Sequence, residues 1–111
     1  MSNSSINVLD GIKKIINHPV SFIELDLRNK DMVDELFNQN PNISGVIHFA
    51  ASKAVGESVL KPLEYYDNNI GSLVNLLQAI ERKGTNFPFI FSSSCTVYGQ
   101  ADQLPIDENA P

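Results

Sequence analysis

Hydrophobic positions along the chain follow two different spacings, and the spacing changes at short polar or proline-containing segments. After two serines, apolar residues recur every three or four positions, which predicts an amphipathic helix over residues 6–17. The pair His18-Pro19 ends that period, and a run rich in β-branched and aromatic residues then predicts a strand over residues 20–25. The chain therefore opens with a helix followed by a strand.

The same alternation continues to the end of the chain. Asn29 can cap a second helix that runs through Phe37, and residues 45–50 form a nearly continuous apolar run that predicts a strand covered on both faces. A longer helix is predicted over residues 62–83, because a proline stands at its start, a glycine stands just past its end and its apolar residues share one face. Residues 87–91 predict a third strand, after which the chain continues as a loop.

Three strands that alternate with helices are typical of an α/β fold with a parallel sheet and right-handed crossovers. No repeat or linker interrupts the order, so residues 1–111 are expected to form a single domain. A parallel α/β domain normally opens on a strand, whereas this chain opens on a helix. The sequence therefore predicts a partial sheet.

Composition limits the classes of partner. Of the 111 residues, 42% are hydrophobic and 19% are charged, as in a globular domain, and the net charge of −5 leaves no basic stripe for nucleic acid or an anionic membrane. A single cysteine, Cys95, cannot form an intramolecular disulfide. The N-terminus has no apolar core of a signal peptide, and no apolar run reaches the length of a membrane span. We therefore expect a cytoplasmic protein without a nucleic-acid or membrane partner.

Candidate chemistry lies where the predicted strands end, since ligands of open parallel sheets bind outside the carboxyl ends of the strands. Asp26 and Leu27 follow the first predicted strand, residues 50–53 follow the second, and a serine-rich segment at residues 92–96 follows the third. Each group has a structural alternative: Asp26 can cap the strand end, Lys53 can be a solvated loop lysine, and the serines can satisfy backbone groups in a turn. His48 is expected to be a satisfied core histidine, and no metal-ligand spacing is present.

The segments GVIHFAASKAVGESVLKPLEYYDNN, FIFSSSCTVYGQ and LPIDENAP resemble the UDP-glucose 4-epimerase family of extended short-chain dehydrogenases over essentially the whole chain. The resemblance implies a Rossmann domain that holds NAD, beside a smaller region for the UDP-sugar. In such enzymes a tyrosine removes the proton from the sugar 4-hydroxyl while hydride passes to NAD, and the transient 4-keto sugar turns over before hydride returns. UDP-glucose and UDP-galactose are thereby interconverted.

The resemblance also implies roles for individual positions. It makes Ser94 the serine of the catalytic set, with a hydroxyl that hydrogen-bonds the reacting sugar oxygen. It also implies contacts with the cofactor at positions spread along the chain. Asn3 and Ser4 match residues near the adenosine ribose, and Asp26 and Leu27 match the pair at adenine. The residues that match the segment along the cofactor are Phe49, Ala50, Ala51, Ser52 and Lys53, and Asn68 matches a residue of a supporting helix.

Two motifs of the family are missing from these residues. No glycines are spaced as in the G-x-G-x-x-G turn that holds the pyrophosphate, and no tyrosine is followed four residues later by lysine. We therefore expect an internal, catalytically incomplete fragment that lacks the first βαβ unit and the substrate region, and that does not epimerise by itself. The alternatives are a fragment of another NAD-dependent nucleotide-sugar epimerase or dehydratase, and a non-catalytic interaction module derived from one.

The strand order of this fold gives a specific expectation for how residues 20–25 pair. In the order 3-2-1-4-5-6, the three predicted strands are the third, fourth and fifth, so residues 20–25 lack their usual neighbours. Unpaired strand edges are costly and invite pairing. We expect residues 20–25 either to pair directly with residues 45–50 or to be covered by a second copy in a homodimer.

Overall fold

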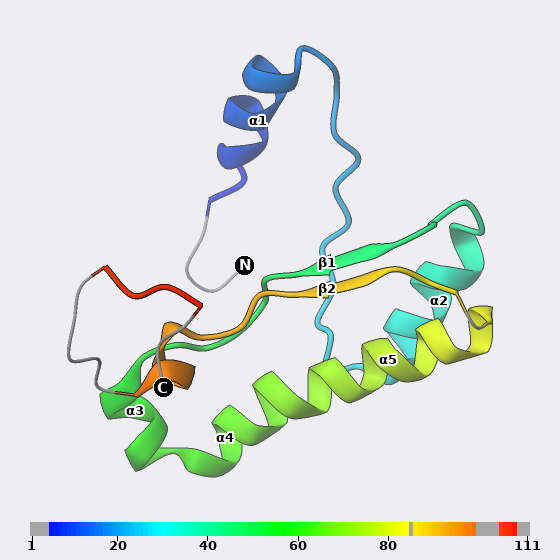
Figure 1. The fold of residues 1–111 in the computed structure, drawn as a ribbon. Helices are drawn as coiled ribbons and strands as arrows, with labels where there is room; N and C mark the ends of the chain where they lie inside the picture. Colours follow the sequence, from blue (N-terminus) through cyan, green and yellow to red (C-terminus); the bar gives the residue numbers. More distant parts are fainter. Residues whose placement is uncertain (1–4, 85, 100–104, 109–111) are drawn as a thin grey trace.

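The fold is a short parallel sheet with helices packed along one side (Figure 1). It is described by a computed structural model for residues 5–84, 86–99 and 105–108. The elements are α1 (Val8–Ile16), α2 (Lys30–Gln39), β1 (Val46–His48), α3 (Val55–Leu60), α4 (Pro62–Tyr66), the π-helical segment η1 (Asp67–Gly71), α5 (Ser72–Lys83), β2 (Phe89–Phe91) and the 3₁₀ turn η2 (Cys95–Tyr98).

The sheet consists of β1 and β2, which pair in parallel with Ile47 opposite Ile90. Backbone hydrogen bonds extend the pairing at both ends, from the Val46 N–H to the Pro88 carbonyl at 2.9 Å and from the Ser92 N–H to the His48 carbonyl at 3.0 Å. Two of the three predicted strands are therefore confirmed, as is the α/β class with a parallel sheet.

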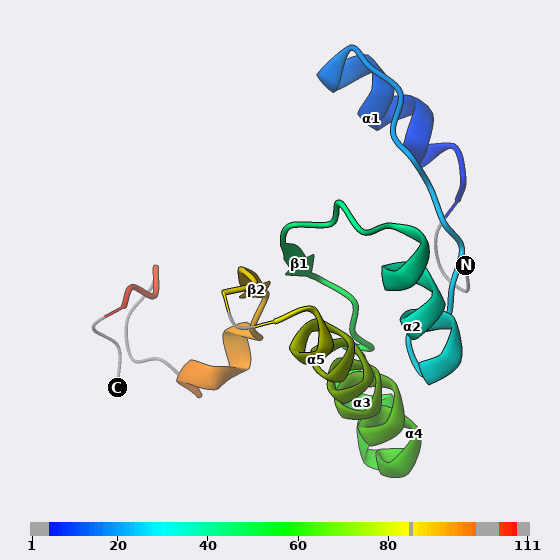
Figure 2. The ribbon, with the colours of Figure 1, turned by 90° about the vertical axis from the view of Figure 1, so that its right-hand side faces the viewer.

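The core lies between α2, α5 and the sheet, as Figure 2 shows. Phe37 of α2 contacts the ring of Phe87, which leads into β2, at a centroid distance of 6.1 Å. Burial of these apolar side chains is the main force that holds the helices to the sheet. The buried hydrophobic residues of this cluster are Val33, Phe37, Leu76, Ala79 and Ile80.

Helix α2 begins where the sequence predicts. The Asn29 side chain accepts a hydrogen bond from the Met32 N–H at 3.2 Å, which satisfies one of the free donors of the first helical turn. Asp34 of α2 binds Lys30 on its own helix at 3.0 Å and also pairs with Arg82 of α5. The cap therefore fixes the start of α2, and the ion pair ties its exposed side to α5.

The predicted helix over residues 62–83 is confirmed in its extent, but it is not a regular α-helix. The segments α4, η1 and α5 follow one another without a break, and η1 has the wider π-helical geometry. At the junction of η1 and α5, the Ser72 hydroxyl donates to the Asn68 carbonyl. The helix ends at Gly84, whose φ of 116° is a backbone conformation that favours glycine.

Residues 20–25 do not form a strand, so the expected three-stranded sheet is wrong. The segment is extended, but the described part of the chain contains no ladder between it and β1. Figure 2 shows it running past α2, on the side away from β1. Val20, Phe22 and Ile23 remain exposed. A β-strand needs a hydrogen-bonded neighbour about 4.8 Å away. Because the turn into α2 holds the end of the segment on the side of the helix, the segment does not pair with β1.

Helix α1 forms near its predicted position but buries none of its residues. It stands away from the sheet and the other helices in both views (Figures 1 and 2). Ile15, on its apolar stripe, is 83% exposed. The amphipathic pattern therefore predicted the helix correctly but not what covers its apolar face.

His48 is buried, as predicted, but it is not satisfied. Its ring packs beside Phe89 and Phe91 at centroid distances of 6.2 and 5.8 Å, and its Nε2 has no hydrogen-bond partner among the described residues. Burial disfavours the charged form and lowers the pKa of His48. The fold therefore requires this imidazole to be neutral.

The lowered pKa predicts how stability depends on pH. Because the unfolded chain binds the His48 proton more readily than the folded chain, the free energy of unfolding should fall as the pH drops from about 7.5 to about 5. Urea titrations should show a smaller fall for His48→Phe than for the unmodified chain. Equal pH dependence in the His48→Phe and unmodified chains would contradict this.

Candidate functional site

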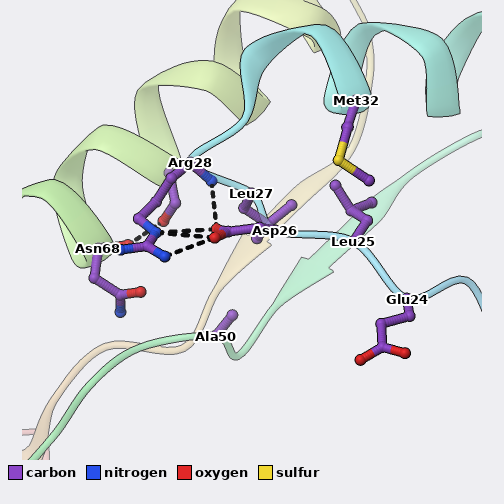
Figure 3. A pocket seen from close by; sticks show the side chains of 9 residues that line it. Glu24, Leu25, Asp26, Leu27, Arg28, Met32, Ala50 and Asn68 are labelled. Carbon is purple, nitrogen blue, oxygen red and sulfur yellow. Dashed lines mark hydrogen bonds and ion pairs between the residues drawn. The ribbon is translucent and has the colours of Figure 1, made fainter. Parts of the chain in front are cut away.

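An open cavity of about 590 Å³ lies where the end of the extended segment, the start of α2, the loop after β1 and the π-helical segment η1 meet (Figure 3). It brings together four residues that the sequence analysis assigned to a cofactor: Asp26, Leu27, Ala50 and Asn68. The rest of its lining consists of Glu24, Leu25, Arg28, Met32 and Ser72.

The Asp26 carboxylate is held by Arg28 (Figure 3). The Arg28 Nη2 donates to Oδ2 at 2.7 Å, Nε lies 3.1 Å from each carboxylate oxygen, and the Arg28 backbone N–H donates to Oδ1 at 3.0 Å. These hydrogen bonds lower the pKa of Asp26 to about 2. Asp26 therefore caps the turn that leads into α2 and not a strand end, and it presents an ionised carboxylate at the cavity.

The backbone of this turn is fixed by two further residues. The Asn75 side-chain amide, from α5, donates to the carbonyls of Leu27 and Arg28 at 3.0 Å each. The Asn29 N–H donates to the Asp26 carbonyl at 2.9 Å. Asn75 was not identified from the sequence, because a single asparagine on a helix gives no signal that it binds a loop 48 residues away.

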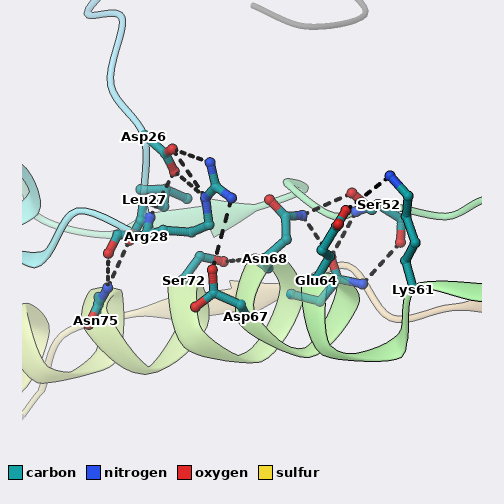
Figure 4. A network of polar contacts seen from close by, with 11 residues as sticks. Asp26, Leu27, Arg28, Ser52, Lys61, Glu64, Asp67, Asn68, Ser72 and Asn75 are labelled. Atoms are coloured by element: carbon teal, nitrogen blue, oxygen red, sulfur yellow. Dashed lines mark hydrogen bonds and ion pairs between the residues drawn. The ribbon is translucent and has the colours of Figure 1, made fainter. Parts of the chain in front are cut away.

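The loop after β1 is anchored at Ser52 by two neighbouring asparagines (Figure 4). The Asn69 side chain accepts from the Ser52 N–H at 2.8 Å and donates to the Ser52 carbonyl at 3.0 Å, as a paired strand would. The Asn68 amide donates to the Ser52 hydroxyl at 3.0 Å and to the Asn69 side-chain oxygen at 2.9 Å. Ser52 is thus fixed through its backbone and its side chain.

Both asparagines lie in the π-helical segment η1. Adjacent residues of a regular α-helix do not face the same point, whereas single π-helical turns alter the direction of side chains and occur often at functional sites. Asn68 was predicted, but Asn69 was missed. The signal for it was a pair of asparagines, which are poor helix formers, inside a long helical pattern.

Other predicted cofactor residues lie on the loop but do not line the cavity. Phe49 is 71% exposed, and Ala51 and Lys53 are also exposed. Lys53 forms no ion pair with any described residue. The predicted residues Asn3 and Ser4 lie outside the described residues.

Ser94, the predicted catalytic serine, lies beyond the end of β2 and is exposed. Its carbonyl accepts a hydrogen bond from the Val97 N–H at 3.1 Å at the start of η2. It does not line the cavity beside Asp26. The structure therefore separates the position predicted for proton transfer from the positions predicted for adenine.

The described residues contain neither a metal-binding cluster nor a membrane-spanning helix. No group of three or more histidine, cysteine, aspartate or glutamate side chains in them is arranged to hold a metal ion. None of the helices they form has both the length and the apolar character needed to cross a membrane.

The chain is similar to known proteins along its whole length. A family model described as GDP-mannose 4,6 dehydratase matches residues 2–111. A UDP-glucose 4-epimerase from Klebsiella pneumoniae is 44% identical over 109 residues, which are 98% of this chain and 77% of that sequence. The chain belongs to the UDP-glucose 4-epimerase family, inside the wider family that this model describes. The recognition made from the sequence motifs is thereby confirmed.

Two further epimerases give the extent of the match. The UDP-glucose 4-epimerase of Bacillus subtilis is 45% identical over all 111 residues. A crystal structure of the Bifidobacterium longum UDP-glucose 4-epimerase in complex with NAD⁺ and UDP is 46% identical, covers 97% of this chain and has a TM-score of 0.83. The chain spans 32% of the length of each of these two epimerases.

The anchoring of Ser52 predicts that Asn69 stabilises this epimerase-family chain. Asn69→Ala removes three hydrogen bonds, two of them to the partly buried Ser52 backbone and one from the Asn68 amide, so it should lower the free energy of unfolding by about 1–3 kcal/mol. Urea titration gives the loss, and hydrogen exchange at the Ser52 amide should accelerate. Asn38→Ala, at an exposed position of α2, gains similar helix propensity without losing this pairing and is the control. Equal stability of the two variants would contradict the role of Asn69.

The ion pair in this epimerase-family chain predicts the titration of Asp26. Its pKa should be about 2 in the unmodified chain and should rise toward about 3.9 in Arg28→Gln. Since the folded pKa is lowered, the stabilisation by Asp26 is present above about pH 3.9 and is lost as the pH falls through about 2. Carboxyl ¹³C NMR measures this titration, and Arg82→Gln, which breaks a different Arg–Asp pair, should leave the Asp26 pKa unchanged. A pKa of Asp26 near 3.9 in the unmodified chain would contradict the pairing of Asp26 with Arg28.

Proposed function

We propose that this chain is part of an NAD-dependent isomerase that interconverts UDP-glucose and UDP-galactose through a transient 4-keto sugar. The observation that carries the proposal is the match to the Bifidobacterium longum epimerase bound to NAD⁺ and UDP, at 46% identity and a TM-score of 0.83. The proposal places the protein in the cytoplasm and in galactose metabolism.

The cofactor in this proposal is NAD, and the cavity fits its adenosine end. An ionised acceptor at Asp26 stands beside Leu27, whose backbone N–H has no acceptor among the described residues. The cavity volume of about 590 Å³ is in the range of small-molecule sites. When bound, NAD supplies the hydride acceptor and donor of the reaction.

The loop after β1 has a second role in the proposal. Phe49, Ala50, Ala51 and Ser52 would lie along the cofactor, and Lys53 would place an ammonium near its ribose and phosphates. The pairing of Ser52 with Asn68 and Asn69 supports this role, because it holds the loop in one conformation before the ligand arrives. Asn3 and Ser4 complete the proposed set at the adenosine ribose.

Ser94 is the catalytic residue of the proposal. Its hydroxyl would hydrogen-bond the reacting sugar oxygen and assist movement of the proton at that oxygen. Its position supports this role, because it follows β2 at the same end of the sheet at which Ser52 follows β1. The substrates in this proposal are UDP-glucose and UDP-galactose.

A homodimer through the sheet is the proposed assembly. Within the described residues β1 pairs with β2 along one edge and has no strand on its other edge. Ile47, Ile90 and Phe91 are at least half exposed on the sheet. An open apolar sheet edge favours pairing with another chain.

A chimaera tests the proposal directly. These 111 residues would replace the segment of the Bacillus subtilis epimerase to which they align at 45% identity. We expect the chimaera to bind NAD and to convert UDP-galactose to UDP-glucose. A folded chimaera that binds NAD but shows no epimerisation would contradict the proposed function.

The same chimaera tests Ser94. Ser94→Ala should lower kcat by about 10²–10⁴-fold with little change in KM, because the hydroxyl acts in the proton transfer and contributes little to binding of the ground state. Ser93→Ala, at an adjacent exposed serine, is the control and should retain most of the activity. Unchanged turnover in Ser94→Ala would assign the serine to a structural role.

A further inference from the structure

Residues 52–57 form a bridge that is fixed at both ends on one helical segment. At the first end, Asn69 of η1 pairs with the Ser52 N–H and carbonyl, at 2.8 and 3.0 Å. At the other end, the Tyr65 hydroxyl of α4 donates to the Glu57 carboxylate of α3 at 2.8 Å. Tyr65 and Asn69 are four residues apart and line the same cleft beside α3. The two anchors therefore lie about one helical turn from each other.

Packing alone does not hold α3 in place. None of its residues is buried, and Val55, Val59 and Leu60 are each at least 70% exposed. Its N-cap is Ala54, which has no side-chain acceptor for the free donors of the first turn. A helix of six residues with so few buried contacts opens easily unless polar contacts hold it.

The Tyr65 hydroxyl provides such a contact at the first turn of α3. Burial of this hydroxyl and its bond to Glu57 raise the pKa of Tyr65, so it keeps its proton and remains a donor, while the nearby Ala54 backbone N–H acts in the opposite direction. Glu57 is the third residue of α3, from which a glutamate often binds the N–H of the N-cap residue directly. Here the tyrosine hydroxyl lies between these two groups.

Lys53 lies between two residues that are held in this way. Ser52 before it is paired through its backbone, and Ala54 after it lies next to the Tyr65 hydroxyl. The Lys53 side chain is exposed and forms no ion pair in the part of the chain that the structure describes. A free ammonium on a fixed backbone needs little further ordering when an anionic group binds.

We propose that Tyr65 is a positioning residue, which holds α3 through Glu57 so that Lys53 faces the phosphates of the bound dinucleotide. This inference rests on the proposed function, in which Lys53 lies near the ribose and phosphates of NAD. It assigns to the reaction a residue that touches neither cofactor nor substrate and that acts only through Lys53.

Hydrogen exchange in the 111-residue chain tests the contact itself. Tyr65→Phe should accelerate exchange of the Ser58 and Lys61 amides, which close turns of α3, by about tenfold, as expected for one hydrogen bond to a charged group. Glu57→Gln keeps an acceptor oxygen and should give a smaller acceleration. Tyr66→Phe is the matched control, because Tyr66 is 68% exposed and its hydroxyl makes no hydrogen bond with the residues that the structure describes. Equal exchange in the two tyrosine variants would overturn the proposal.

A double-mutant cycle in the Bacillus subtilis chimaera tests whether Tyr65 acts through Lys53. Tyr65→Phe should lower kcat/KM for UDP-galactose by about tenfold, and Lys53→Met should lower it by at least as much. In the Lys53→Met background, Tyr65→Phe should cost less than about twofold, because the group that it positions is already absent. Tyr66→Phe should keep most of the activity in both backgrounds.

Two activity results would overturn the proposal. Unchanged kcat/KM in Tyr65→Phe would show that Lys53 is positioned without the tyrosine. The same loss in the Lys53→Met background as in the unmodified chimaera would show a structural role that is independent of Lys53. If Tyr65→Phe does not fold, Glu57→Ala removes the same hydrogen bond at an exposed position and replaces it in the cycle.

Failure of the proposed function would be recognised separately. An unmodified chimaera that folds and binds NAD but does not epimerise would contradict the proposed function, and the role of Tyr65 in the reaction would fail with it. The exchange rates in the 111-residue chain would still report whether Tyr65 holds α3, because they require neither cofactor nor substrate.

Discussion

Parallel strands cannot be joined by a tight turn, so the pairing of β1 with β2 requires the intervening residues 49–88 to leave the sheet and return along it. Helix α5 makes the return, and it lies against both the sheet and α2 because its buried face carries Leu76, Ala79 and Ile80. The long-range contacts of the candidate site depend on this crossover. It places one long helical segment beside two separate loops.

The helical segment fixes those loops with side-chain amides. Asn75 binds the carbonyls of the turn that contains Leu27, and Asn69 pairs with both backbone groups of Ser52. Loops have unpaired backbone groups, and these amides satisfy them without adding charge to the site. The charged side chains of the cavity lining come instead from Glu24, Asp26 and Arg28, whereas Lys53 lies exposed on the loop after β1. In this protein the helical segment therefore positions the loops, and the loops carry the charged side chains.

Patterns that depend on neighbours along the chain predicted most of the fold. The Asn29 cap and the long helix from residue 62 to residue 83 were found because capping residues and the helical period are local properties. The apolar run at residues 45–50 predicted a strand, and β1 forms within it. The strand predicted at residues 20–25 failed for the opposite reason. β-propensity describes how well a side chain suits a sheet, and the ladder depends on what lies beside the segment in space.

The candidate site was predictable to the extent that it follows the strand ends. Asp26, Leu27, Ala50 and Asn68 were assigned from the sequence and meet at one cavity. Arg28, Asn69 and Asn75 were not assigned, because an arginine two residues from an acid and single amides on a helix give no periodic signal. The contacts of Asn69 and Asn75 depend on the crossover, which brings residues 17 to 48 positions apart into hydrogen-bond distance, while Arg28 pairs with Asp26 within one turn.

In the proposed function, the turn at residues 26–28, the loop at residues 50–53 and Asn68 form one dinucleotide site. Mapping backbone amide chemical shifts on addition of NAD tests it most directly, since it reports every segment at once. We expect the shifts to concentrate in these three segments and to follow a single binding curve, while the amides of α1 remain unchanged. Shifts spread over α1 and the exposed sheet face, or separate binding curves for the three segments, would contradict it.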